Sequence, residues 1–337
     1  MKTGVLLINV GTPDSPELGD VRRYLSEFLN DPYVIDLPWL SRKILVNGVI
    51  IPFRAKNSSE LYKRLWTENG SPLLINSINC AEKLQVELGE DYVVRAAMRY
   101  QNPSIKEALL LMKNEIDNLV VVPMYPQYAE SSTRTSIEKT NGTFNRLGMS
   151  MPKRIVEAFY NDQGFLSSFA SKINNAQPEL FDHILFSFHG LPERHLTKLH
   201  NDGHSCLNCS CEREDVVNED ICYKAQCYKT VRSLVGITGM KEGDYSVGFQ
   251  SRLDKKWLTP FSDVMISDMA KHGVRRLLVV SPAFVADCLE TTVEIGFEYK
   301  ELFKHHGGKD LVLVESLNDS EKWVKALAGL VKREFVK

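Results

Sequence analysis

The segment LFSFHGLP at residues 185–192 decides the fold, because it places a strongly apolar run directly before a glycine and proline loop. Such a run is typical of a buried strand in a parallel sheet. The segment LLINVGTP at 6–13 has the same form. A second pair, VVVPMYPQYAESST at 120–133 and VVSPAFVADCLETT at 279–292, repeats strand, proline, loop and a Glu followed by hydroxyl residues. These repeats predict two related halves; chance matches between strands are the alternative.

The rest of the chain alternates short apolar strands with longer helical patterns. Apolar runs at 92–98 and 245–251 are accompanied by helical patterns such as SIKEALLLMKNEI at 104–116 and EKWVKALAGLVKREF at 321–335. This alternation is the signature of βαβ units. We therefore predict an α/β fold with two Rossmann-like halves, each a parallel sheet flanked by helices, at residues 1–160 and 161–337.

Composition and charge exclude several classes of protein. The chain has 43% hydrophobic and 25% charged residues, which is enough for a sizeable core. A formal net charge of -2 offers no basic surface for nucleic acid. The first apolar run is broken by Gly11 and Pro13, and no run reaches the roughly 18 residues of a membrane span. We expect a cytoplasmic protein.

A histidine and a series of acidic residues are the candidates for chemistry. Ligand sites in open α/β sheets lie at the carboxyl ends of strands, where the second half carries His189 and the first half carries Val10. Asp287, Glu290 and Glu294 follow an apolar strand end at spacings of three and four. One imidazole and several carboxylates without a thiolate suit weak binding of Fe²⁺ or Zn²⁺ in transit. A structural histidine beside a solvated acidic face is the alternative.

Several ordered motifs closely resemble those of ferrochelatases. They include LINVGTPDSPE at 7–17, VRRYLSEFLNDP at 21–32, MRYQNPSIKEAL at 98–109, FSFHGLPE at 186–193 and DCLETTVEIGFEY at 287–299. The resemblance covers nearly the whole chain. It implies a chelatase-type fold whose two halves face each other across a porphyrin cleft, and insertion of ferrous iron at the last step of haem biosynthesis.

The resemblance also implies roles for single residues. His189 matches the catalytic histidine, Glu290 the glutamate opposite it, and both could hold the metal together with Asp287 and Glu294. The residues that match substrate-binding positions are Val10, Phe28, Leu29, Lys56, Ser71, Arg99, Tyr100 and Trp257. His189 can act as base or as ligand, and iron can arrive past the carboxylates or from the wall of Arg99 and Tyr100.

Residues 33–56 form a stretch rich in large apolar side chains. It suits a lip over an apolar ligand or a segment that lies on a membrane surface, whereas a buried helix is the alternative. The apolar residues expected at a peripheral membrane contact are Trp39, Leu40, Ile44, Leu45, Ile50 and Ile51, with Arg42, Lys43, Arg54 and Lys56 around them. The sequence is also compatible with a homodimer.

A cysteine-rich insert at residues 196–227 departs from the common family pattern. Cys206, Cys209, Cys211 and Cys222 are the candidate ligands, with Cys227 as a substitute for one of them. In a reducing compartment such thiols suit zinc or a [2Fe-2S] cluster, and a segment without metal is the third reading. Resemblance to ferrochelatases that carry a cluster favours [2Fe-2S].

Three other functions compete with insertion of iron into protoporphyrin IX. The substrate could instead be coproporphyrin III, although the apolar lip favours the less polar porphyrin. Cobalt chelatases share the two-half fold, but they typically pair histidines where this chain has Glu290. A non-catalytic haem or metal carrier would have no need of the acidic series.

Overall fold

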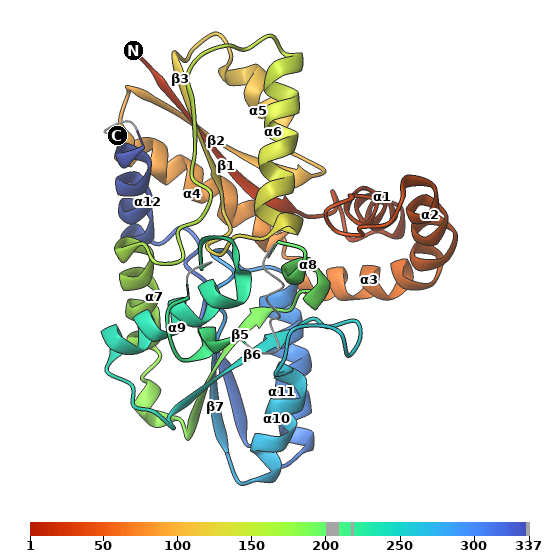
Figure 1. Ribbon diagram of the computed structural model, residues 1–337, viewed down its shortest axis with the longest axis vertical. Coiled ribbons are helices and arrows are strands. Elements are labelled where there is room, and N and C mark those ends of the chain that lie inside the picture. The colour runs from red at the N-terminus through yellow and green to blue at the C-terminus, as the bar shows by residue number, and fades with distance from the viewer. Residues whose placement is uncertain (200–208, 217–218, 335–337) are drawn as a thin grey trace. The chain divides into compact units, whose positions relative to one another are not determined.

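The computed structural model describes residues 1–199, 209–216 and 219–334. The chain divides into two compact units. The first consists of Met1–Tyr125, Ala129–Ala158 and Asn318–Lys337, and the second of Pro126–Tyr128 and Phe159–Leu317. Each unit contains one four-stranded parallel sheet flanked by helices (Figure 1), so the predicted fold class is confirmed. The domain boundary expected between residues 160 and 161 stays a prediction.

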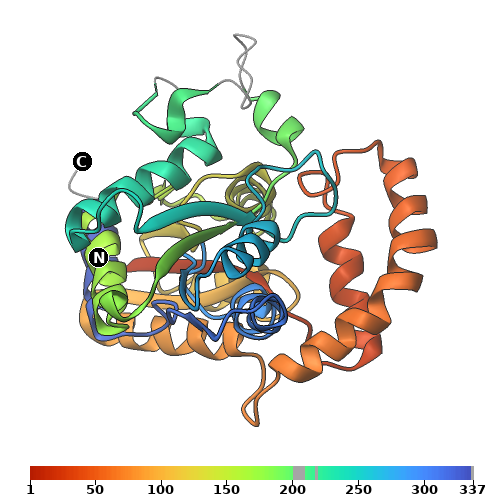
Figure 2. The same ribbon diagram turned by 90° about the horizontal axis from the view of Figure 1, so that it is seen from below.

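The sheet of the first unit has the strand order β2-β1-β3-β4. Its strands are β1 (Thr3–Gly11), β2 (Tyr92–Tyr100), β3 (Asn118–Pro123) and β4 (Lys153–Ile155). The helices of this unit are α1 (Leu18–Leu29), α2 (Trp39–Ile44), η1 (Leu45–Ile50), α3 (Ile51–Leu65), α4 (Pro72–Leu88), α5 (Ile105–Met112), η2 (Glu130–Arg134), α6 (Thr135–Arg146) and α12 (Glu321–Arg333). Helices α4 and α12 pack together, and α1 to α3 lie to one side of the sheet in both Figure 1 and Figure 2.

The sheet of the second unit has the equivalent order β6-β5-β7-β8. Its strands are β5 (His183–His189), β6 (Tyr245–Gln250), β7 (Arg276–Val280) and β8 (Asp310–Leu313). Its helices are α7 (Gln163–Asn175), η3 (Pro178–Leu180), α8 (Glu193–Thr197), η5 (Ser210–Glu212), η6 (Glu219–Ile221), α9 (Tyr223–Thr238), α10 (Ser262–Lys271), η7 (Leu289–Tyr299) and α11 (Lys300–His305). Because both sheets place their strands in the same order, the internal repeat is structural.

Strands β1 and β5, which contain the two repeated segments, each lie between two neighbours. Their apolar residues are almost fully buried, as a central parallel strand covered on both faces requires. Around β1 the core includes Leu6, Ile8, Leu109 and Val121, and around β5 it includes Leu185, Leu277 and Phe303. The carboxyl ends of β1 and β5 carry Val10 and His189, as the sequence predicted.

Two members of the acidic series, Glu290 and Glu294, lie on a π-helix that the periodicity of the sequence did not predict, and Asp287 lies just before it. The segment Leu289–Tyr299 forms η7, and the equivalent segment Glu130–Arg134 of the first unit forms a shorter π-helix, η2. A π-helix bonds each amide to the carbonyl five residues back, so its turn is wider than that of an α-helix. Such segments are uncommon and are often found at functional sites.

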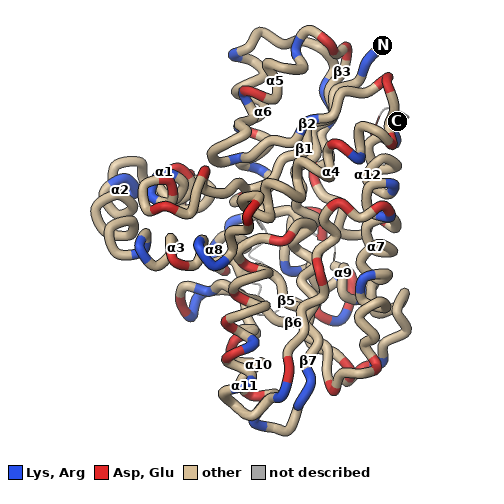
Figure 3. Tube along the Cα trace, turned by 180° about the vertical axis from the view of Figure 1, so that it is seen from behind, with Lys and Arg blue, Asp and Glu red and all other residues tan. Residues whose placement is uncertain are grey.

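The apolar stretch at 33–56 is not a buried helix. Trp39 is 66% exposed and Phe53 is 83% exposed, and Leu40 and Ile44 are also at the surface. Two of the expected surface residues are buried instead: Ile51 faces the interior, and the guanidinium of Arg42 donates to the carbonyl of Leu37 at 2.6 Å. Figure 3 shows where Lys and Arg residues lie along α2 and α3.

Among the described residues, no helix combines the length and the apolar character that crossing a membrane requires.

Candidate active site

His189 is the last residue of β5, and its ring orientation is determined by a local hydrogen bond. Nδ1 lies 2.6 Å from the carbonyl oxygen of Gly190. Because a carbonyl can only accept, Nδ1 carries the proton in the neutral ring, and Nε2 keeps its lone pair. The rings of Trp257 and Phe284 lie 6.4 and 6.3 Å from the imidazole, centroid to centroid. The ring is therefore set among aromatic groups with Nε2 as its basic atom.

The backbone around His189 is held by residues from β6 and α9. The hydroxyl of Tyr223 donates to the carbonyl of His189 at 2.9 Å, and the amide of Gly190 donates to the carbonyl of Gln250 at 2.8 Å. A Cβ at position 190 would lie 2.8 Å from that same carbonyl oxygen, so glycine is required there. The strand end is thus rigid, as a precise catalytic geometry requires.

Gln250 joins the strand of His189 to the start of the π-helix. It is the register partner of His189 in the sheet, and its Oε1 accepts from the hydroxyl of Ser187 at 2.8 Å. Its Nε2 donates to the carbonyl of Glu290 at 3.0 Å. Glu290 is therefore attached to the same strand ends as His189. The only signal in the sequence was a polar residue at the end of the apolar segment YSVGFQS.

Glu290 is partly buried and lies beside a buried thiol. Burial raises the pKa of Cys288 well above its usual value, and the neighbouring carboxylate of Glu290 raises it further. Cys288 therefore stays protonated and can donate to Glu290.

The carboxylate of Glu294 already accepts several hydrogen bonds. Ser251 donates to it through its amide at 2.9 Å and its hydroxyl at 2.6 Å, and the hydroxyl of Tyr299 donates at 2.8 Å. Burial and the charge of Glu294 raise the pKa of Tyr299 well above its usual value, which keeps this donor protonated. Asp287 accepts from the amide of Ser316 at 3.3 Å. Both carboxylates are thus oriented by neighbours in the second unit.

No complete metal site is preformed in the part of the chain that the structure describes. Within residues 1–199, 209–216 and 219–334, no three or more His, Cys, Asp or Glu side chains are arranged to hold a metal ion. The expected ligand set of His189, Asp287, Glu290 and Glu294 stays a prediction.

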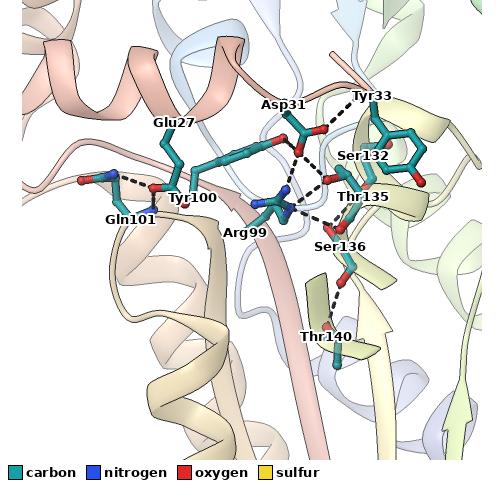
Figure 4. A network of polar contacts seen from close by, with 10 residues as sticks. All are labelled: Glu27, Asp31, Tyr33, Arg99, Tyr100, Gln101, Ser132, Thr135, Ser136 and Thr140. Atoms are coloured by element: carbon teal, nitrogen blue, oxygen red, sulfur yellow. Dashed lines mark hydrogen bonds and ion pairs between the residues drawn. The ribbon is translucent and has the colours of Figure 1, made fainter. Parts of the chain in front are cut away.

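Arg99 and Tyr100 end β2 in the first unit, and a buried network holds both (Figure 4). The guanidinium of Arg99 pairs with the carboxylate of Asp31, and the hydroxyl of Tyr100 donates to the same carboxylate at 2.9 Å. Nε of Arg99 donates to the hydroxyl oxygen of Thr135 at 2.8 Å. Asp31 and Thr135 were missed at the level of sequence, because nothing local distinguishes them from solvated polar residues.

The other expected substrate-binding residues of the first unit lie in different environments. Phe28 packs edge-on against Tyr100 with 5.2 Å between ring centroids. Leu29 and Ser71 are buried, Val10 is partly buried, and Lys56 is exposed. Gly11 has a φ of 108°, and a Cβ there would lie 2.0 Å from the carbonyl of Tyr100, so only glycine allows β1 and β2 to end side by side.

The described cysteines of the insert lie together against α9. Burial raises the pKa of Cys211 above its usual value, with further contributions from the thiols of Cys209 and Cys222. Burial likewise raises the pKa of Cys227, and the thiols of Cys222 and Cys211 contribute. Arg232 of α9 donates to the carbonyl of Cys211 at 2.8 Å. Cys206, the first expected ligand, lies outside the described residues.

Comparison with known proteins identifies the family. The family model described as Ferrochelatase matches residues 2–335. The chain belongs to the ferrochelatase family. A ferrochelatase of Azotobacter vinelandii is 42% identical and covers 97% of this chain and 98% of its own length. A ferrochelatase of Coxiella burnetii is 40% identical, with coverages of 99% and 94%.

Two solved structures have a similar fold. SirB from Bacillus subtilis with Fe3+ has a TM-score of 0.52 at 11% identity and covers 99% of this chain and 96% of its own. The sirohydrochlorin chelatase SirB in complex with cobalt has a TM-score of 0.54 at 9% identity, with coverages of 99% and 95%. At these identities the likeness shows the fold alone, and it agrees with the predicted chelatase-type architecture. The family confirms the prediction of a metal chelatase that forms haem by inserting iron into a porphyrin.

Proposed function

We propose that His189 and Glu290 carry out the insertion of ferrous iron into protoporphyrin IX. The observation that carries this proposal is the bond from Nδ1 of His189 to the carbonyl of Gly190, which leaves the Nε2 lone pair available. The tie from Gln250 to the start of η7 supports the assignment of Glu290 to the same site.

The reaction requires a group that accepts protons while a dication enters the macrocycle. Two pyrrole protons leave as one Fe²⁺ binds. Nε2 of His189 can take the first proton or hold the iron, and the carboxylate of Glu290 can take the second. We assign outward transfer to Asp287 and Glu294, the latter through the hydroxyls of Ser251 and Tyr299 that already contact it.

The porphyrin is proposed to bind against apolar side chains. A flat free-base ring must bend before a metal reaches its nitrogens, and burial of the macrocycle against apolar walls can supply the required binding energy. Phe28, Tyr100 and Trp257 are aromatic groups suited to such walls. The other residues assigned to porphyrin or its propionates are Val10, Leu29, Lys56, Ser71 and Arg99.

An anaerobic assay of metal insertion tests the proposed function. The purified protein is mixed with protoporphyrin IX and Fe²⁺, and the loss of porphyrin fluorescence is followed. Faster turnover with coproporphyrin III would reassign the porphyrin, and turnover only with Co²⁺ and a reduced tetrapyrrole would identify a cobalt chelatase. Tight haem binding without turnover with any of these substrates would identify a carrier.

We propose peripheral membrane contact through α2, η1 and α3, because the porphyrin and haem are poorly soluble in water. The exposed rings of Trp39 and Phe53 are the anchors, and Lys43, Arg54 and Lys56 can contact lipid head groups. A cytoplasmic location and a homodimer are compatible with this arrangement and stay predictions.

Replacing Trp39 and Phe53 together by Asp is expected to lower the bound fraction in liposome flotation by about tenfold or more, since two exposed rings that would insert into the membrane are lost. The matched control is Val86→Asp on α4, because Val86 is as exposed as Phe53 at 83%. Flotation that is the same for all three proteins would contradict membrane contact through this segment.

We propose that the cysteine insert binds a [2Fe-2S] cluster, with zinc as the alternative. Cys206, Cys209, Cys211 and Cys222 are the assigned ligands, and Cys227 can replace one of them. The proximity of the described thiols supports a thiolate site, although no complete ligand set is formed among the described residues. When bound, such a cluster would cross-link a segment that has few apolar residues of its own.

Purified protein is expected to contain about two non-haem irons and two labile sulfides per chain. Cys209→Ser or Cys222→Ser should abolish the visible absorption. Cys80→Ser, which changes a buried thiol on α4 of the other unit, should leave the absorption unchanged. If the protein contains one zinc ion and no labile sulfide, the insert holds a zinc site and not a cluster. A metal-free protein that is as stable as the metal-bound form would exclude both.

A further inference from the structure

Asp31 is a buried carboxylate on which four hydrogen-bond donors converge. Its side chain is 1% exposed. Oδ2 accepts from the hydroxyl of Thr135 at 2.6 Å and from the hydroxyl of Tyr100 at 2.9 Å, and it pairs with Nη2 of Arg99. Oδ1 accepts from the amide of Tyr33 at 2.8 Å. Figure 4 shows these groups arranged around the one carboxylate.

The position of Asp31 explains how two successive residues of β2 reach one partner. Neighbouring side chains of a strand normally point to opposite faces of the sheet. Here the Cζ atom of Arg99 lies 4.3 Å from the ring centroid of Tyr100, and both side chains end at Asp31. The loop after α1 therefore determines where the polar groups at the end of β2 point.

A second carboxylate, Glu27 on α1, holds the next residue after the same strand. Glu27 accepts from the amide of Gln101 at 3.1 Å and from its side-chain nitrogen at 2.7 Å. Gln101 has a φ of 66°, a conformation that costs energy in a residue with a side chain. Glu27 therefore stabilises the backbone turn, whereas Asp31 contacts the charged side chain.

The charge of Arg99 is the feature that requires Asp31. The Arg99 side chain is only 12% exposed, so water screens its charge poorly. Burial raises the pKa of Tyr100 well above its usual value, so the phenol stays neutral and does not compensate the guanidinium. An uncompensated cation at this position would repel Fe²⁺ that arrives along the wall of Arg99 and Tyr100, and the carboxylate of Asp31 cancels that charge.

We propose that Asp31 is a positioning residue of iron insertion: it directs Arg99 and Tyr100 and neutralises the charge that iron would otherwise meet. This inference rests on the proposed function, in which Tyr100 and Arg99 contact the porphyrin, and on arrival of iron from their side. It predicts that loss of the Asp31 charge raises the KM for Fe²⁺ more than the KM for the porphyrin.

The test is Asp31→Asn, which keeps the size of the side chain and removes its charge. The KM for Fe²⁺ is expected to rise by about tenfold or more, as an uncompensated charge in a poorly screened site produces. The KM for protoporphyrin should change by about twofold or less, since the shape of the wall is kept. In the double variant Asp31→Asn with Arg99→Gln, which restores neutrality, the KM for Fe²⁺ should return to within about threefold of wild type.

The matched control is Glu27→Gln on α1, the helix that precedes Asp31, which should move the two KM values together. Equal rises of both KM values in Asp31→Asn would show a merely structural role, and no change in either would remove the role altogether. If Asp31→Asn does not fold, the double variant tests the inference in its place, because it leaves no buried charge unpaired. In that variant, a KM for Fe²⁺ that is still raised about tenfold would overturn the inference. A wild-type protein that inserts no iron would instead refute the proposed function.

Discussion

Replacing His189 by alanine is expected to lower the turnover of iron insertion by about 100-fold or more, as loss of a general base or essential ligand does. Nε2 of His189 is the basic atom at the end of β5, and its orientation depends on the bond from Nδ1 to Gly190. The fold should persist, because the imidazole is only partly buried and its hydrogen bond is local. Steady-state fluorescence assays give the turnover, and quenching titrations with protoporphyrin give the affinity.

The same strand supplies a matched control for this variant. His183 begins β5, and its Nε2 contacts the hydroxyl of Ser246 at 2.8 Å, at the opposite end of the strand from His189. His183→Ala should therefore lose some stability and keep its turnover. If His189→Ala kept more than about a tenth of wild-type turnover, the loss would be smaller than general base catalysis provides, and the assigned site would be wrong.

The second large effect is expected for Glu290→Gln, which should lower turnover by about 100-fold while changing porphyrin affinity little. The amide keeps the shape of the side chain, and the bond from Gln250 to the backbone of residue 290 is retained. What is lost is the charge that receives a proton or guides the metal. The measurement compares kcat with porphyrin affinity for the same preparation.

Glu301→Gln is the control for the removal of one negative charge. Glu301 lies on α11, where it pairs with Lys304 at 3.2 Å with a side chain that is 59% exposed. Its replacement should leave both parameters at wild-type values. Parallel losses of affinity and turnover in Glu290→Gln would identify a structural carboxylate and transfer the proton-accepting role to another member of the acidic series.

In the apolar stretch at 33–56, composition alone does not predict which residues are exposed. Its residues predicted either a buried helix or an exposed lip, because both structures are rich in apolar residues. Only the packing of α2, η1 and α3 separates exposed Trp39 and Phe53 from buried Ile51. The charged residue Arg42 could not be placed from composition either. It was expected at the surface, but its guanidinium is buried and donates to the carbonyls of Ile35 and Leu37.

The sequence by itself determined the two-sheet α/β fold and its internal repeat, because hydrophobic runs and Gly and Pro positions are local signals of strands and turns. The family was indicated separately, by the resemblance of motifs such as FSFHGLPE and DCLETTVEIGFEY. The sequence also indicated His189, which ends such a strand. The tertiary structure alone revealed the hub at Asp31, whose partners Arg99, Tyr100 and Thr135 lie 68, 69 and 104 residues away along the chain. An aspartate after a helix has the same local pattern whether it is solvated or buried, and only folding brings its distant donors together.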